Sequence, residues 1–302
     1  MKHLFVINPI AGGKKHNPQE TKKSIEIIAQ EMGIDYEIYT TTGPLDATKK
    51  VSEEADKQDE LRVYACGGDG TLNECCNGTA GKANTSVTHF PTGTGNDFIK
   101  TFGKENVDKF RDLRALINGQ IRKLDLIDCG GGRYGINICS VGIDARVGRD
   151  VHKYSKLPIV GGAAGYVVAL ISNVIRGVSQ KYHVSGCGIE RDEHITLMCA
   201  CNGRFYGGGF NPVPDAIPDD GILEILIIDA VSRIKVAAVV GKYSKGRYRE
   251  LSGIVTHLRG DSMEVGAEKE FVVQIDGEII HRKKLLIKLI PQGINFVFPE
   301  GI

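Results

Sequence analysis

The sequence has no strong charge of either sign, no C-x-x-C motif and no recognisable secretory segment. Lys and Arg total 38 against 37 Asp and Glu, for a formal net charge of +1. A chain this near neutrality presents no field that would attract nucleic acid, so we expect no nucleic-acid partner. None of the eight cysteines forms a C-x-x-C pair, which argues against a zinc site. Without a signal peptide, the thiols are predicted to be reduced and the chain cytoplasmic.

Several enzyme signatures are also missing from the chain. It contains no G-x-x-x-x-G-K-[ST], which excludes a P-loop, and no H-E-x-x-H or G-x-S-x-G. One G-x-G-x-x-G string does occur, from Gly130 to Gly135. Because it lies between two strand-like runs instead of opening a helix, it predicts a hairpin turn and not a dinucleotide site.

One uncharged run, Pro158 to Ile175, is nearly long enough to span a bilayer. It contains three glycines, a serine and an asparagine, and it begins with proline. We therefore interpret it as a buried helix near an apolar cleft, with lipid contact as the alternative, and not as a transmembrane helix.

The composition is that of a globular protein, with 41% hydrophobic and 25% charged residues. The length of 302 residues suits one large domain or two ordinary ones. The first third alternates strand and helix patterns, which predicts a parallel sheet covered by helices on both faces. Strands are expected at His3–Asn8, Asp35–Thr40, Arg62–Cys66 and Ser86–Phe90, and helices at Pro18–Glu31 and Asp46–Lys57.

The pattern changes near Ile121, after which strand-like runs follow one another with few helical patterns between them. This half is predicted to be an antiparallel β-sandwich, with the domain boundary close to Lys123. Its later strands are expected at Tyr182–Gly186, Ile195–Cys201, Ile222–Asp229, Phe271–Ile275, Leu285–Ile290 and Ile294–Phe298.

Three glycine-containing loops each follow a strand of the first half: "NPIAGGKK", "GGDGTLNE" and "PTGTGNDF". Glycine lets the backbone take positive φ and lets another group approach closely, so such loops can direct several N–H groups at an anion. All three are expected at the carboxyl edge of the parallel sheet, where ligands bind. A carboxylate within a phosphate site indicates a metal ion that balances the charge, so the loops predict a Mg²⁺-nucleotide site.

Five segments in this order, "NPIAGG", "GGDGTLNE", "GTGNDF", "PDAIPDDGILEILII" and "QIDGE", span nearly the whole chain. The chain thereby resembles the diacylglycerol kinase catalytic domain and its relatives, the sphingosine, ceramide and bacterial lipid kinases. "GGDGT" alone is shared with NAD kinases and phosphofructokinase-like enzymes, so the combination carries the resemblance. The resemblance implies an α/β nucleotide-binding domain formed by residues 1–123, to which about residues 291–302 return. A β-sandwich domain, residues 124–290, would complete the lipid cleft.

The resemblance also implies a nucleotide pocket and a general base. The residues that match the ATP-contacting positions are Asn8, Pro9, Ile10, Ala11, Gly12, Thr41, Gly68, Asp69, Gly70, Thr71, Leu72, Asn73, Glu74 and Thr94. Many members have serine where Ala11 stands, so one hydroxyl contact to phosphate is missing here. Glu278 in "QIDGE" matches the general base, with Asp276 as the second choice.

Two magnesium sites follow from the same resemblance. Asp69, Asp97 and Asp125 would form a water-linked network that holds the Mg²⁺ of Mg-ATP. Asp220 would be the side-chain ligand of a structural Mg²⁺, with backbone carbonyls from Ile217 and Ile222. One carboxylate with carbonyls and waters suits this ion.

Each acid also has a structural interpretation. Asp97 could be a helix N-cap, Asp125 could pair with Arg122 or Lys123, and Asp220 could simply form a turn. The Asp276-Gly277 dipeptide is a hairpin signal in its own right, which would leave Glu278 an ordinary strand residue.

The expected activity is ATP-dependent phosphorylation of a lipid hydroxyl, with diacylglycerol as the acceptor and Mg²⁺ as the cofactor. NAD kinase-like phosphorylation of a soluble substrate and a non-catalytic nucleotide-binding regulator are the alternatives. A lipid substrate implies reversible, peripheral association with a membrane surface, and a homodimer is left open.

Overall fold

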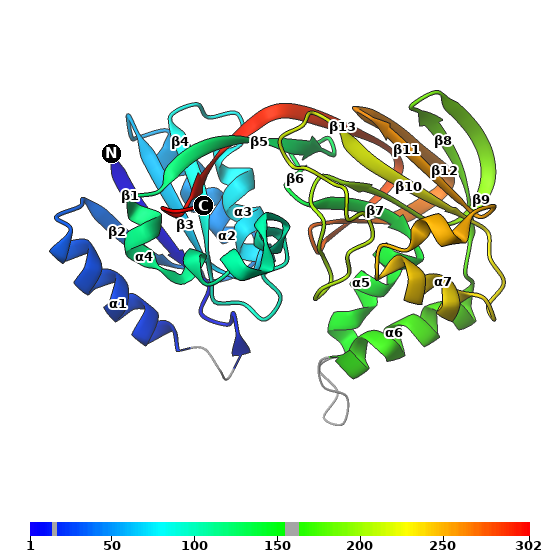
Figure 1. The fold of residues 1–302 in the computed structure, drawn as a ribbon, viewed down its shortest axis with the longest axis horizontal. Coiled ribbons are helices and arrows are strands. Elements are labelled where there is room, and N and C mark those ends of the chain that lie inside the picture. The colour runs from blue at the N-terminus through cyan, green and yellow to red at the C-terminus, as the bar shows by residue number, and fades with distance from the viewer. Residues whose placement is uncertain (14–16, 155–162) are drawn as a thin grey trace. The chain divides into compact units, whose positions relative to one another are not determined.

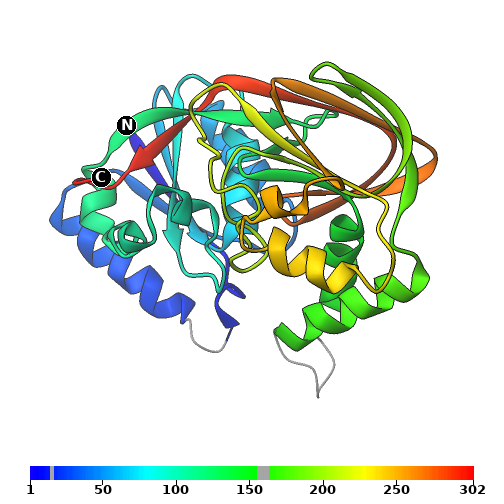
Figure 2. The same ribbon diagram turned by 45° about the vertical axis from the view of Figure 1, so that its right-hand side comes forward.

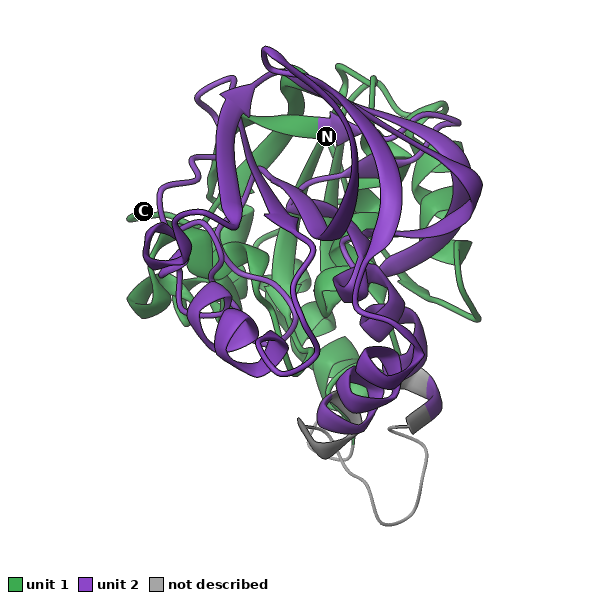
Figure 3. Cartoon of the chain, turned by 90° about the vertical axis from the view of Figure 1, so that its right-hand side faces the viewer, with its two compact units in different colours: residues 1–126, 290–302 green, residues 127–289 purple. Residues whose placement is uncertain are grey.

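The computed structural model describes residues 1–13, 17–154 and 163–302. The chain divides into two compact units, which Figure 3 colours separately. Unit 1 comprises residues 1–126 and 290–302, and unit 2 comprises residues 127–289. The sequence placed this division near Lys123 and Pro291.

Unit 1 is an alternation of strands and helices, as the sequence predicted (Figure 1). Its elements are β1 (Lys2–Ile7), α1 (Pro18–Glu31), β2 (Tyr36–Thr40), α2 (Asp46–Ala55), β3 (Leu61–Gly67), α3 (Asp69–Thr79), β4 (Thr85–Pro91) and α4 (Leu113–Ile117), with 3-10 turns at Phe98–Phe102, Lys104–Asn106 and Lys109–Arg111. The predicted bounds shift by no more than about two residues, the usual uncertainty at element ends.

The strands of unit 1 run in the order β4-β3-β1-β2, and each neighbouring pair is parallel. From β1 the chain passes through α1 to β2 on one side, and then through α2 back to β3 on the other side. Because such crossovers are right-handed, α1 covers one face of the sheet, and α2 and α3 cover the other. The order therefore reverses between β1 and β3, which creates a topological switch point at their carboxyl ends.

The end of the chain completes unit 1. The last strand, β13 (Glu278–Phe298), begins in unit 2 and ends in unit 1, where Phe296 lies opposite Val87 in a parallel pairing with β4. Thr88 Oγ1 donates a hydrogen bond to the Val297 carbonyl at 2.7 Å. Phe296 and Phe298 pack against the aromatic rings of the 3-10 turns, including Phe102. This burial fixes the returning segment to unit 1.

Unit 2 is built mainly from antiparallel strands. Its elements are the end of β5 (Gln120–Asp128), β6 (Tyr134–Gly135), β7 (Ile138–Gly142), α5 (Ile143–Tyr154), α6 (Ala163–Arg176), β8 (Gln180–Gly186), β9 (Ile189–Cys201), β10 (Leu223–Asp229), α7 (Val236–Tyr243), a 3-10 turn (Tyr248–Leu251), β11 (Val255–Gly260), β12 (Ser262–Ile275) and most of β13.

The central strands of unit 2 are buried on both faces. On β9, Met198 and Ala200 point into a core formed among the strands. Their neighbours Leu197, Cys199 and Cys201 face a second core. Helices α5, α6 and α7 supply the other side of that second core. Figure 2 shows these helices beside the strands. The expectation of few helices in this half was therefore wrong, because amphipathic helices are needed to cover the outer face of the sheet.

Two further expectations can be compared with the fold. The Gly130–Gly135 string is a hairpin turn, as predicted: β5 pairs with β6, and Gly130 and Gly131 have positive φ. The two strands expected at Leu285–Ile290 and Ile294–Phe298 are one continuous strand, with Gln292 at φ +52° between them.

The uncharged run Pro158–Ile175 lies partly outside the described residues, and its described part belongs to α6. Ala169 and Asn173 are buried, but Val167, Ile171 and Ile175 are exposed, so the buried-helix interpretation holds for only one face. Among the described residues, no helix has both the length and the apolarity needed to cross a membrane.

Candidate active site

The loops after β1 and β3 meet at the switch point of unit 1. Asn8 directly follows β1, and its Nδ2 donates to Thr71 Oγ1 in the first turn of α3 at 3.1 Å. Its Oδ1 accepts the Ile10 N–H, which folds the "NPIAGG" loop into a tight turn. Gly12 and Gly13 end that turn with φ of +72° and +58°. The first N–H groups of α3 have no partner within the helix, so this end can hold an anion.

Glycine is required where the loops after β3 and β4 touch. A Cβ on Gly93 would lie 2.4 Å from the Gly68 Cα, so no other residue fits there. The Gly67 carbonyl accepts the backbone N–H groups of Thr92 and Gly93 at 2.9 and 3.0 Å. It is also 3.0 Å from His89 Nε2, which donates to it. These contacts bind the two loops into one rigid surface.

Two carboxylates come together on that surface. Asp69 Oδ1 accepts the N–H groups of Asp97 and Phe98 at 2.6 and 3.1 Å. A Cβ on Gly95 would lie 3.0 Å from Asp69 Oδ2 and 3.7 Å from Asp97 Oδ2, so the acids flank this glycine. The sequence predicted that Asp69 and Asp97 would lie together. Asp97 begins the 3-10 turn Phe98–Phe102, although its side chain caps no N–H of that turn.

The electrostatics of this pair favour a cation. Burial raises the pKa of Asp69 above its usual range; His89 partly offsets this, and the Asp97 carboxylate adds to it. Lys100 Nζ neutralises one side of Asp97 at 2.6 Å, through Oδ1. A buried carboxylate with a raised pKa is one whose charge is incompletely compensated, and a bound cation would supply the compensation. Two carboxylates with water in the remaining positions fit Mg²⁺.

Asp125, the third acid of the expected network, has a structural contact. It is fully buried on β5, and its Oδ1 accepts the N–H of Gln292 at 2.7 Å. Gln292 has a positive φ, so this bond holds a strained point of β13 in place. Its participation in a metal network stays a prediction.

Glu74 also has a contact that the motif did not predict. Its carboxylate oxygens accept the N–H groups of Leu45 and Ala47 at 2.9 and 3.1 Å, at the start of α2. A carboxylate at a helix N-terminus satisfies unpaired donors and interacts favourably with the helix dipole. Glu74 therefore fixes α2 to α3, and any nucleotide contact it makes is additional to this role.

The remaining residues expected at the nucleotide differ in accessibility. Exposed positions that a ligand can reach are Pro9, Ile10, Gly70 and Thr94, and half-buried ones are Asn8, Ala11, Gly12, Thr41 and Gly68. Leu72 and Asn73, by contrast, are buried in α3. The side chain of Leu72 belongs to the core of unit 1, so it shapes the pocket only through the helix.

In unit 2, Asp276 and Glu278 occupy the hairpin between β12 and β13. Asp276 and Gly277 have φ of +49° and +97°, the positive values of a two-residue turn, and Glu278 pairs with Ile275. Asp276 Oδ2 accepts the Ile136 N–H at 2.7 Å, and its Oδ1 accepts those of residues 137 and 138 at 3.1 and 2.7 Å. Asp276 thus anchors the turn, whereas Glu278 is half-buried on the first residue of the strand.

Asp220 lies in a turn before β10. Its Oδ1 accepts the Ile222 N–H at 3.0 Å, and its Oδ2 is 3.8 Å from an Arg259 nitrogen. Gly221 has a φ of +74°, and Ile217 is exposed. The turn interpretation is therefore correct, and Arg259 already offsets part of the charge. The structural Mg²⁺ site stays a prediction; among the described residues no three His, Cys, Asp or Glu side chains gather as a metal cluster.

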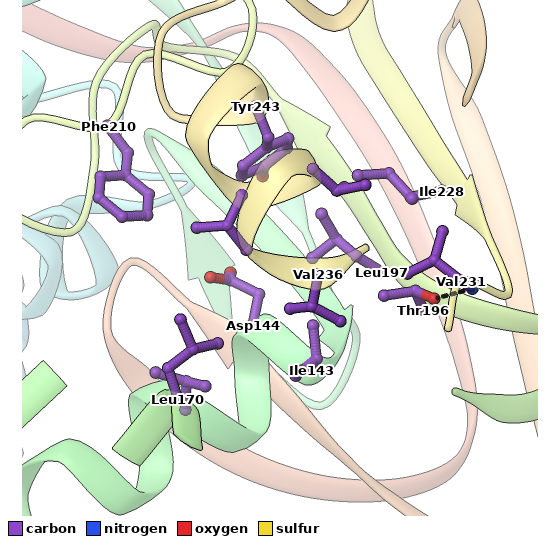
Figure 4. A pocket seen from close by; sticks show the side chains of 13 residues that line it. Ile143, Asp144, Leu170, Thr196, Leu197, Phe210, Ile228, Val231, Val236 and Tyr243 are labelled. Carbon is purple, nitrogen blue, oxygen red and sulfur yellow. Dashed lines mark hydrogen bonds between the residues drawn. The ribbon is translucent and has the colours of Figure 1, made fainter. Parts of the chain in front are cut away.

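Unit 2 contains an apolar cleft between the outer face of β9 and β10 and helices α5 to α7 (Figure 4); the sequence predicted a helix near an apolar cleft at residues 158–175 but not the other walls. Its unfilled space is about 430 Å³, including the part open to solvent. Its walls are Ile143, Asp144, Val147, Leu170, Thr196, Leu197, Phe210, Ile228, Val231, Val236, Val239, Val240 and Tyr243. Such a lining suits an alkyl chain.

One acid, Asp144, lies in that apolar wall. It accepts hydrogen bonds from Ser140 Oγ at 2.8 Å and from Tyr206 OH at 3.1 Å. Tyr206 OH in turn is 3.0 Å from Tyr243 OH. Burial raises the pKa of Asp144 despite these bonds. No motif marks Asp144, and only the packing of α5 against α7 reveals it. His89 and Gly95 were likewise missed, although Gly95 lies within the quoted "GTGNDF".

The two units of the fold correspond to two family models, and these identify the chain as a kinase. Residues 2–129 match the diacylglycerol kinase catalytic domain, and residues 137–298 match the family described as "YegS C-terminal NAD kinase beta sandwich-like domain". The chain belongs to the diacylglycerol kinase family of bacterial lipid kinases.

Relatives agree with this assignment, and solved structures share the fold. A protein named "Putative lipid kinase" from Staphylococcus haemolyticus is 26% identical over 79% of this chain and 77% of its own length. One from Staphylococcus aureus is 26% identical over 78% and 76%. A structure titled a putative diacylglycerol kinase from Bacillus anthracis has a TM-score of 0.75 at 23% identity, covering 99% and 97%. An NAD kinase from Archaeoglobus fulgidus in complex with ATP shares the fold at a TM-score of 0.50 and 14% identity, covering 99% and 94%.

Proposed function

We propose that the chain transfers the γ-phosphoryl group of ATP to the hydroxyl of diacylglycerol. The observation that carries the proposal is the pairing of Asp69 and Asp97 around Gly95, at the switch point of a parallel sheet. Phosphoryl transfer needs in-line positioning and charge neutralisation more than covalent help from the protein. Glycine-framed N–H groups and an acidic pair supply those two requirements.

Each part of the site has one role in this proposal. The Asn8–Gly13 turn and the N-terminus of α3 hold the phosphates through backbone N–H groups. Asp69 and Asp97 hold Mg²⁺ through water, and the ion, when bound, offsets charge on the transferred group. Glu278 accepts the proton of the attacking hydroxyl. Asp276 is less suited to that step because three backbone N–H groups already occupy its two oxygens.

The apolar cleft of unit 2 supports a lipid acceptor over a soluble one. Twelve of its thirteen lining residues present hydrocarbon, a hydroxyl or an aromatic ring, and Asp144 is the exception. An NAD-like substrate carries two phosphates and two riboses, which such a wall would leave without partners. We therefore assign the cleft to an acyl chain, and we place the enzyme reversibly at a membrane surface.

The test is phosphate transfer from radiolabelled ATP to a panel of acceptors in mixed micelles. The panel contains diacylglycerol, a long-chain base, ceramide and a polyprenol, with NAD as the soluble acceptor. Label in phosphatidic acid supports the proposal. Label in NAD alone would identify an NAD kinase, and ATP binding without transfer to any acceptor would identify a regulator.

A further inference from the structure

Helix α6 has an exposed apolar stripe. Over Val167–Arg176, where its side chains are described, the exposed residues are Val167, Ile171, Ile175 and Arg176. The three apolar side chains are 51%, 54% and 66% exposed. They follow one another at intervals of four residues and therefore form a single stripe along the helix. A helix on a protein surface normally carries polar residues on its outer face, so the stripe requires an explanation.

The segment before α7 extends this apolar surface. Arg233 donates from its guanidinium to the Ile175 carbonyl at 3.0 Å, which places the two segments side by side, as Figure 2 also shows. The next residue, Ile234, is 92% exposed. Because Ile234 lies beside the end of the apolar stripe, it adds to one exposed apolar patch and is not a single scattered apolar residue.

Basic residues border the patch. Arg176, Arg233 and Lys235 are exposed at the end of α6 and the start of α7. The neighbouring acid, Asp150, is already paired with Arg149 at 2.8 Å and with Arg176 at 2.8 Å. An apolar strip with a cationic border is complementary to a bilayer surface that contains anionic lipids.

The patch and the apolar cleft use residues of the same part of the chain, helix α6 and the beginning of α7. Leu170 on α6 lines the cleft, and Val236 on α7 lines it from the other side (Figure 4). Helix α6 therefore presents apolar side chains outward in the stripe and inward in the cleft.

We propose that Val167, Ile171, Ile175 and Ile234 form a membrane-docking surface that inserts into the interface of an anionic bilayer, with Arg176, Arg233 and Lys235 contacting lipid headgroups. The purpose of the surface rests on the proposed lipid kinase function, but the binding itself does not need catalysis. A second copy of this chain is the competing occupant, and the experiment distinguishes the two.

The experiment is sedimentation of the full chain with vesicles of phosphatidylcholine alone or mixed with phosphatidylglycerol. We expect binding to the mixed vesicles that weakens with salt. Ile171→Ser/Ile175→Ser should weaken it at least ten-fold, because each buried isoleucine contributes at least about a factor of ten. Lys235→Ala should weaken it about five-fold on mixed vesicles and leave phosphatidylcholine vesicles unaffected.

The matched control is Ile27→Ser, an exposed isoleucine on α1 (46%) with Lys23 and Glu31 four residues away on either side. It should bind vesicles as the unsubstituted protein does. Thermal melting of every variant checks that the fold is retained. Equal binding by the α6 double variant, or no binding by the unsubstituted chain, would overturn the proposal. So would a dimer in solution that the double variant dissociates, since the stripe would then contact a second copy. Because no step uses ATP, these outcomes are independent of whether the kinase proposal holds.

Discussion

Replacing Asp69 with asparagine should separate the catalytic role of this residue from its structural one. The Asp69→Asn change keeps an oxygen that can accept the two N–H groups of Asp97 and Phe98. It removes the charge beside Asp97, where Mg²⁺ would be held. Stability and activity should therefore change independently.

The expected stability change follows from the pKa of Asp69. Burial raises this pKa in the folded protein, so the ionised carboxylate costs free energy at neutral pH. Each unit by which the folded pKa exceeds the unfolded one corresponds to about 1.4 kcal/mol. The amide has no charge to bury, so Asp69→Asn should melt at the same temperature as the parent or a few degrees higher.

The expected activity change has the opposite sign. Removing a preorganised group that stabilises transition-state charge typically costs about 10²–10³ in kcat. We expect a loss at least this large in labelled-phosphate transfer, with nucleotide binding measured separately. The matched control is Asp112→Asn: Asp112 Oδ1 also accepts two backbone N–H groups, those of Arg114 and Ala115, but at the start of α4. It should retain full activity. Parent-like turnover by Asp69→Asn in a normally folded protein would refute the argument.

Three further predictions concern unit 2. Glu278→Gln should lower kcat and kcat/KM together by about 10²–10⁴, with ATP affinity unchanged. Asp276→Asn should mainly lower stability, because an amide nitrogen would face a backbone donor; the expected loss in urea unfolding is about 1–3 kcal/mol. The reverse pattern would move the base to Asp276. Asp220→Ala should abolish any Mg²⁺-dependent rise in melting temperature, and an unchanged rise would place the metal elsewhere. The pKa of Asp144 is higher in the folded protein than in the unfolded chain. The parent should therefore lose stability as the pH rises from the unfolded-state pKa, near 4, through the folded-state pKa. Asp144→Asn should show no such loss from this site. Parallel stability–pH curves for the two proteins would show that Asp144 does not titrate in this interval.

The sequence determined the fold of unit 1 because each of its signals is local. Pro18 begins α1 after Asn17, whose side chain accepts the Gln19 N–H, and the apolar runs of β1 and β3 are bounded by glycine loops. Strand–helix alternation then permits few topologies, so the carboxyl edge and its three loops follow without tertiary information. Asp69 was identifiable for the same reason, as an acid within a glycine loop, whereas Asp97 was identified through the family resemblance.

Only the tertiary structure decided what each acid contacts. Glu74 lies in the same motif as Asp69, yet its carboxylate caps α2, because α2 and α3 pack side by side. Asp276 and Glu278 are two residues apart, and only the approach of residues 136–138 shows which of them anchors the turn.

Sequence patterns did not identify α5 and α7, and they did not predict the exposed face of α6. Helix α6 is apolar on its inner and outer faces, so periodicity could not tell a buried helix from one with an exposed stripe. The cleft and Asp144 within it arise from side chains far apart in the chain, brought together by packing. Local patterns specify the elements and their order. Only the folding of the whole chain decides which side of an element packs against another and which polar groups are buried away from water there.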